Sequence, residues 1–101
     1  MKLLGIVIAT KRDLARVARL AHAARAQDVD VAIFAMDEGV AALAADRAAV
    51  AALLADEVQV VACGESSHQR GLKEADLGCV IGSQFDHAQI AHKADRLLSF
   101  T

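Results

Sequence analysis

The fold is decided around residues 58–71, which read VQVVACGESSHQRG. A short run rich in β-branched residues ends on Cys63, a glycine follows it, and the polar residues beyond are typical of a helix start. A thiol in this position lies at the carboxyl end of a strand, where free amide N–H groups and the positive end of a helix dipole stabilise a thiolate. We therefore interpret Cys63 as the reactive residue of a small α/β protein, and the rest of the chain as its scaffold.

Strand-like and helix-like segments alternate on both sides of this stretch. Apolar runs predict five strands, at residues 3–9, 29–36, 58–62, 79–81 and 96–100. The last run could also continue the helix before it, but its alternation of side chains favours a strand. Helical spacing predicts helices at residues 10–26, 40–55, 67–70 and 86–94, the second with a break near Asp46. Such alternation predicts a three-layer α/β sandwich with a five-stranded, mostly parallel sheet and helices on both faces.

Short local signals predict where some of these helices begin and end. Thr10 and Asp13 fit a capping box for the first helix, and Ser66 and Gln69 fit one for the helix after the cysteine. Gly71 suits the left-handed conformation that ends many helices. We expect Ser66 to act mainly as a cap.

Length and composition limit the size of the core. A chain of 101 residues forms one domain, residues 1–101. Hydrophobic residues make up 55% of the chain, but aromatic residues make up only 3% of it. The alanine-rich helices contribute little apolar area to a core. Because such a core is thin, we expect apolar surface to be buried between the subunits of a homo-oligomer.

Charge and hydropathy argue against two other classes of protein. The net charge of −2 is unlike that of general nucleic-acid binders, which are usually strongly basic. No apolar run approaches the roughly 18 residues that a membrane span needs. Lys11 and Arg12 follow the first run, where a signal peptide would have small cleavage-site residues. With two cysteines and no export signal, we expect a reducing compartment, the cytoplasm.

Cys63 has a plain interpretation as well as a chemical one, because cysteine often serves as a small core residue. Arg70 would stabilise a thiolate or persulfide anion if the helix folds back over the strand, and would otherwise face solvent. His68 is either an acid or base for the thiol or a solvated side chain. Glu65 would raise the pKa of the thiol if its carboxylate came near the sulfur.

The other cysteine, the remaining histidines and the glycines indicate no metal or cofactor site. Cys79 begins a predicted strand, and we interpret it as a packing residue. His87 and His92 are five residues apart, which does not align them on one helix face as in zinc-binding helices. The 6 glycines form neither a dinucleotide-binding nor a phosphate-binding loop. We therefore expect no metal and no organic cofactor.

Four features, in order, resemble the DsrE/DsrF-like family of small sulfur-relay proteins, which includes TusD-type subunits. They are the opening run at 3–9, the sequence FAMDEGV at 34–40, the segment from Cys63 to Gly71, and the closing ADRLLSF at 94–100. The resemblance spans nearly the whole chain. It implies a five-stranded α/β fold, which supports a strand at 96–100, and assembly as trimers or hexamers.

In the sulfurtransferase members of this family, a cysteine at this position accepts sulfane sulfur as a persulfide and passes it to a cysteine of a partner protein. The resemblance carries that role to Cys63 alone, with sulfur donor and acceptor proteins as partners. The alternative is a non-catalytic assembly or regulatory subunit of the same fold, in which Cys63 only packs. A third interpretation, a cysteine phosphocarrier, would place its cysteine after the first strand, where this chain has Thr10.

Overall fold

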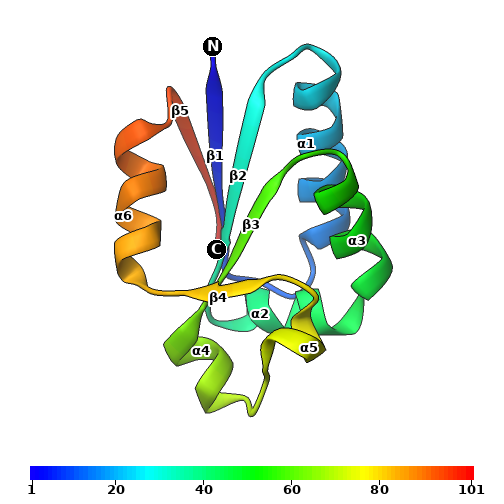
Figure 1. Ribbon diagram of the computed structural model, residues 1–101, viewed down its shortest axis with the longest axis vertical. Coiled ribbons are helices and arrows are strands. Elements are labelled where there is room, and N and C mark those ends of the chain that lie inside the picture. The colour runs from blue at the N-terminus through cyan, green and yellow to red at the C-terminus, as the bar shows by residue number, and fades with distance from the viewer.

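A five-stranded parallel sheet forms the middle layer of the computed structural model, which describes residues 1–101 (Figure 1). The strands are β1 (Leu3–Ile8), β2 (Asp30–Ala35), β3 (Gln59–Cys63), β4 (Val80–Gly82) and β5 (Arg96–Phe100), in the spatial order β4-β3-β2-β1-β5. The helices are α1 (Leu14–Ala26), α2 (Glu38–Ala45), α3 (Arg47–Ala55), α4 (Gly64–Gln69), α5 (Glu74–Leu77) and α6 (Gln84–Lys93). All five predicted strands are present, and the predicted α/β sandwich is confirmed. None of the helices combines the length and apolar character that a membrane crossing requires.

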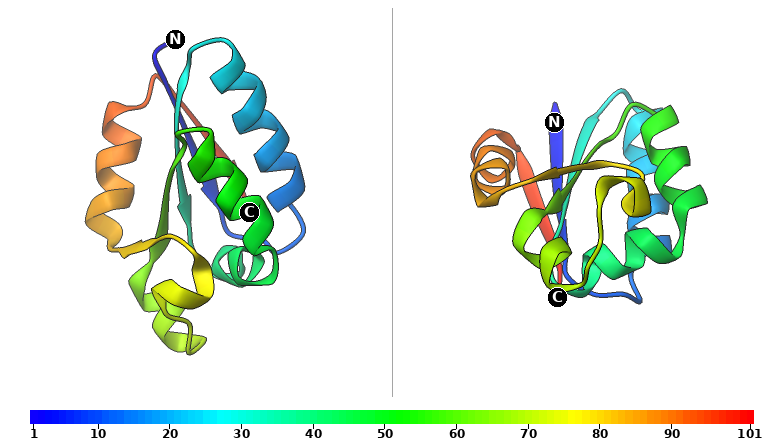
Figure 2. Two further views of the ribbon diagram at one scale, coloured as in Figure 1. Left: turned by 45° about the vertical axis from the view of Figure 1, so that its right-hand side comes forward. Right: turned by 60° about the horizontal axis from the view of Figure 1, so that its bottom comes forward.

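Helices cover the two faces of the sheet unequally. The larger core has 19 buried residues and lies between the sheet and α1, α2, α3 and α5. On the other face, α6 contributes Ile90 to a core of 5 buried residues, which also contains Phe34 and Cys63. Figure 2 shows α6 beside one face of the sheet and α1 and α3 against the other. The cysteine therefore belongs to the thinner of the two cores.

The break predicted in the alanine-rich segment is confirmed at Asp46. Its Oδ1 accepts a hydrogen bond from the amide of Ala49 at 3.1 Å, so Asp46 caps α3 at the point where α2 has ended. Gly71 has the predicted left-handed conformation after α4, with a φ of 67°.

Neither predicted capping box forms. α1 begins at Leu14 with Asp13 as its N-cap, and the Thr10 hydroxyl instead donates a hydrogen bond to the Asp13 carboxylate. α4 begins at Gly64, earlier than predicted, so that Ser66 lies inside the helix. The capping box predicted for Ser66 and Gln69 was wrong because the Ser66 hydroxyl accepts a hydrogen bond from the backbone amide of Asp37, in another segment, rather than from an amide of its own helix.

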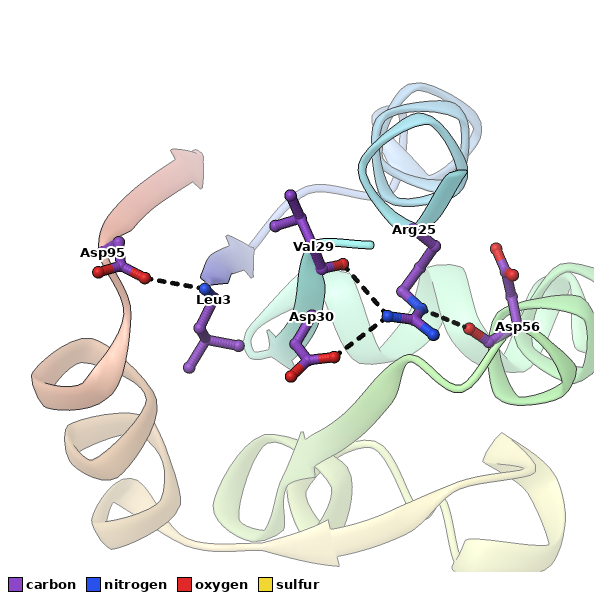
Figure 3. A network of polar contacts seen from close by, with 6 residues as sticks. All are labelled: Leu3, Arg25, Val29, Asp30, Asp56 and Asp95. Atoms are coloured by element: carbon purple, nitrogen blue, oxygen red, sulfur yellow. Dashed lines mark hydrogen bonds and ion pairs between the residues drawn. The ribbon is translucent and has the colours of Figure 1, made fainter. Parts of the chain in front are cut away.

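Polar contacts fix the amino ends of the strands (Figure 3). Arg25, at the end of α1, donates hydrogen bonds to the Asp56 carbonyl at 2.9 Å and to the Asp30 carboxylate at 3.1 Å, which ties α1 to β2 and to the end of α3 (Figure 3). Asp95, just before β5, accepts hydrogen bonds from the amides of Lys2 and Leu3, both at 2.9 Å. These two hydrogen bonds hold the pKa of the Asp95 carboxyl below its usual value.

The carboxyl ends of all five strands meet at the opposite edge, because every strand pair is parallel. In open α/β sheets this is the edge where functional residues gather. Here β3 ends on Cys63 and β4 ends on Gly82, which are paired across the sheet. The short helices α2, α4 and α5 lie at this end of the molecule (Figure 1).

Candidate functional site

Cys63 is the last residue of β3 and the N-cap of α4, as expected for a thiol between a strand and a helix. The residue is 4% exposed, so its side chain is almost covered. A side chain on the next residue, Gly64, would bring a Cβ within 2.9 Å of the Gly82 carbonyl oxygen. Glycine after the cysteine therefore lets α4 begin close against β4.

Hydrogen-bond donors surround the sulfur of Cys63. Burial raises the pKa of the thiol, but hydrogen bonds from the hydroxyl and amide of Ser66, the side-chain amide of Gln84 and the amide of Glu65 outweigh it, so the pKa lies below its usual value. Every contribution that lowers this pKa comes from a neutral donor, and none comes from a charged side chain. The site therefore favours the thiolate by oriented dipoles rather than by an ion pair.

Ser66 reaches the sulfur from the first turn of α4. Its hydroxyl oxygen accepts a hydrogen bond from the amide of Asp37 at 2.9 Å. Because the hydroxyl hydrogen points away from that amide, the hydroxyl can donate this hydrogen to the sulfur. Asp37 lies between β2 and α2 and has a φ of 49°, an unusual conformation for a residue other than glycine. The neighbouring Ser67 points elsewhere, because its hydroxyl donates to the carbonyl oxygen of Cys63 at 2.7 Å.

Gln84 reaches the sulfur from α6. Its Nε2 donates a hydrogen bond to the Cys63 Sγ at 3.7 Å, while its Oε1 lies 3.0 Å from Nδ1 of His87, one turn along the same helix. The His87 ring stacks on the buried ring of Phe34, with centroids 5.0 Å apart and planes 14° apart. Three side chains from β2 and α6 are thus linked to the thiol of β3.

No motif in the sequence links Gln84 or His87 to the thiol, and the sequence predicts Ser66 to be a helix cap. One signal pointed to α6: Ser83 and Asp86 form a capping box directly after β4, with Ser83 Oγ accepting from the Phe85 amide at 3.1 Å. A helix that begins at the end of β4 places its first residues beside the end of β3, because the two strands are paired.

The structure does not bring Arg70 or His68 to the sulfur. One Arg70 nitrogen, Nη2, donates to the Glu38 carboxylate at 2.8 Å, and the other, Nη1, donates to the Ser66 carbonyl at 3.1 Å. His68 is exposed near the end of α4. Neither residue is among the groups that change the pKa of Cys63. Glu65 is exposed and acts on the thiol through its backbone amide.

Cys79 lies in a different environment, just before β4 begins. It is 8% exposed, and burial together with the Glu74 carboxylate raises the pKa of its thiol to about 11. Both cysteines are free. Cys63 pairs with Gly82 of β4, and Cys79 comes three residues before Gly82. At roughly 3.3 Å per residue, Cys79 is therefore displaced from Cys63 by about 10 Å along the strand direction. A disulfide between them would require the backbone to move.

No group of three or more His, Cys, Asp or Glu side chains converges in a way that could hold a metal ion. His87 instead contacts Gln84 and Phe34.

Comparison with known proteins finds one matching family and a similar solved structure for this chain. The family model described as the DsrE/DsrF-like family matches residues 1–100. Among solved structures, the crystal structure of the YchN protein from E. coli is similar over 99% of each chain, with a TM-score of 0.80 and 25% sequence identity. A search among curated proteins found no match.

Proposed function

Because the chain belongs to the DsrE/DsrF-like family, which is generally involved in sulfur relay, we propose that Cys63 accepts sulfane sulfur as a persulfide and passes it to a thiol of a partner protein. The observation that carries this proposal is the set of neutral donors around the sulfur, which keeps the pKa of the thiol low despite its burial. A thiolate is the nucleophile in sulfur transfer, so a lowered pKa raises the reactive fraction at neutral pH.

The transfer takes place in two steps that balance without an outside oxidant or reductant. In the first, the Cys63 thiolate attacks the outer sulfur of a donor persulfide; the new S–S bond forms as the donor's S–S bond breaks, and the donor leaves as a thiolate. In the second, an acceptor thiolate attacks the outer sulfur now held on Cys63, and Cys63 leaves as a thiolate. The donors that stabilise the Cys63 thiolate lower its pKa, which makes it a better leaving group in the second step.

The position of the sulfur sets how a partner must reach it. Cys63 is 4% exposed, and the exposed side chain of Gln84 contacts its sulfur. A partner thiol therefore approaches over the start of α6, where Phe85 is 68% exposed. Rotation of Gln84 about its side-chain bonds opens this approach without a change in the fold.

Mass spectrometry after incubation with inorganic polysulfide tests the proposal. We expect the native protein to gain one sulfur atom, and a reductant to remove it. Cys79→Ser should gain the sulfur as readily, because the buried Cys79 thiol is protonated at neutral pH, whereas Cys63→Ser should not. A native protein that gains no sulfur, or a Cys63→Ser variant that still does, would contradict the proposal.

The second candidate is an assembly or regulatory subunit in which Cys63 has no chemical role. It is favoured by the position of Cys63 in the smaller core, together with Phe34, Val61 and Ile90. The rate of alkylation separates the two candidates. A structural cysteine reacts only as fast as the protein unfolds, whereas the sulfur-relay proposal requires reaction in the native state under conditions where unfolding is negligible.

The exposed apolar surface supports assembly of several copies, which remains a proposal. On β5, an edge strand, Leu97 and Leu98 are 41% and 39% exposed. Leu98 also lines an apolar groove of about 360 Å³ together with Leu4 and Leu20. Sedimentation at micromolar concentration tests this: a stable monomer would contradict a trimer or hexamer.

A further inference from the structure

Gln84 and His87 form a chain of contacts that ends at the sulfur of Cys63. Gln84 Nε2 lies 3.7 Å from the sulfur, and Gln84 Oε1 lies 3.0 Å from His87 Nδ1. The far end of the chain is fixed, because the His87 ring stacks on Phe34, which is fully buried. Gln84 itself is exposed, so only its two polar contacts hold the amide in place.

The two ends of a carboxamide are chemically different, and only one of them suits a thiolate. The oxygen accepts hydrogen bonds, whereas the nitrogen donates them. Because Oε1 can only accept, Nδ1 of His87 must carry the hydrogen that joins them. With the oxygen held in this way, the NH2 group faces the sulfur. A flipped amide would turn a lone pair toward the thiolate and set its own N–H against that of the histidine.

We propose that His87 is a positioning residue that acts through Gln84, holding the amide oxygen so that the amide N–H points at the Cys63 sulfur and favours its anionic form. This inference rests on the proposed function only in taking Cys63 as the reacting thiol. Without His87, the exposed Gln84 side chain gains rotamers that do not contact the sulfur, and its contribution to thiolate stability falls.

No charged side chain near Gln84 and His87 stabilises the Cys63 thiolate in their place. On α6, the Asp86 carboxylate accepts from the Ser83 amide at 2.8 Å and caps the helix. On α4, Glu65 is exposed, and Arg70 is paired with Glu38 of α2.

The test is the pH dependence of Cys63 alkylation in full-length Cys79→Ser protein, with two matched variants of His87. His87→Phe keeps a ring to stack on Phe34 but has no donor. His87→Asn keeps a donor near the position of Nδ1 but has no ring. We expect His87→Phe to move the alkylation midpoint to higher pH and to slow alkylation below the midpoint about threefold, the loss of one weak donor to the anion. His87→Asn should restore most of the rate.

Gln84→Leu completes the experiment. It should slow alkylation at least as much as His87→Phe, and the double variant should be no slower than Gln84→Leu alone, because both changes remove the same contact. The inference is overturned if His87→Phe titrates like the parent protein, if His87→Asn is as slow as His87→Phe, or if the two effects add. Alkylation is independent of sulfur loading. A protein that shows these shifts but takes up no sulfur would refute the proposed function and leave this inference standing.

Discussion

Removal of the Ser66 hydroxyl should raise the pKa of Cys63 and slow its reactions. In Ser66→Ala the sulfur loses a side-chain donor but keeps the amides of Glu65 and Ser66 and the side chain of Gln84. The same change leaves the amide of Asp37 without the acceptor it has at 2.9 Å. The variant therefore has two separate consequences, one for the chemistry of the thiol and one for the stability of the fold.

The size of each effect follows from the contact that is lost. A hydrogen bond to a charged group contributes about 1.5 kcal/mol at the lower end of its range, which is about a tenfold change in an equilibrium. We therefore expect alkylation of Cys63 at a pH below the midpoint to slow about tenfold. The unpaired Asp37 amide should cost about 1 kcal/mol in the free energy of unfolding.

Ser67→Ala is the matched control for this experiment. It removes a hydroxyl from the next position of α4, but that hydroxyl donates to the carbonyl of Cys63 and not to its sulfur. Denaturant unfolding should show a similar loss of stability in both variants, whereas only Ser66→Ala should shift the pH profile of alkylation. Equal shifts in both variants, or none in Ser66→Ala, would refute the account of the donors.

Three further predictions concern charge. Arg70→Gln should leave the pH profile of Cys63 unchanged, because the guanidinium is paired with Glu38 and does not contact the sulfur; a midpoint raised in this variant, measured by alkylation, would show that the charge acts on the thiol. Raising the salt concentration should shift the same midpoint little, because the lowered pKa comes from hydrogen bonds rather than ion pairs. Between about pH 9 and 11 the protein should lose stability, relative to Cys79→Ala, by about 2 kcal/mol. The sign follows because the pKa of the buried Cys79 thiol is raised to about 11, so the unfolded chain ionises first; denaturant unfolding across this pH range measures the difference, and parallel curves would contradict it.

The sheet could be predicted from the sequence because burial on both faces leaves a plain pattern. β1 is buried from Leu4 to Ile8, and β2 is buried from Val31 to Ala35. Such strands are continuous apolar runs, and helices with a buried stripe lie between them. The position of Cys63 at the end of a strand followed from the same pattern.

The starts of the helices were less predictable because serine has more than one way to satisfy its hydroxyl. The Ser66–Gln69 spacing fits a capping box, but the amide of Asp37, far away in the sequence, takes the Ser66 hydroxyl instead. A contact of this kind depends on how α2 and α4 pack, which no local motif records.

The partners of the thiol were hidden for a similar reason. Gln84 is 21 residues from Cys63 in the sequence and meets it because β4 lies beside β3. Arg70, seven residues after Cys63, was a candidate neighbour of the sulfur, but its guanidinium binds the Glu38 carboxylate and the Ser66 carbonyl instead. Nearness in sequence was therefore a poor guide to the neighbours of the sulfur, whereas strand order was a good one.

The most direct test of the central claim is the alkylation midpoint of Cys63 in native Cys79→Ser protein, compared with the same protein unfolded in denaturant. We expect a native midpoint below that of the unfolded chain, whose thiol should titrate near the ordinary value of about 8.5. A native midpoint at or above the unfolded one would mean that burial outweighs the donors, and that Cys63 is a core residue rather than a reactive thiol.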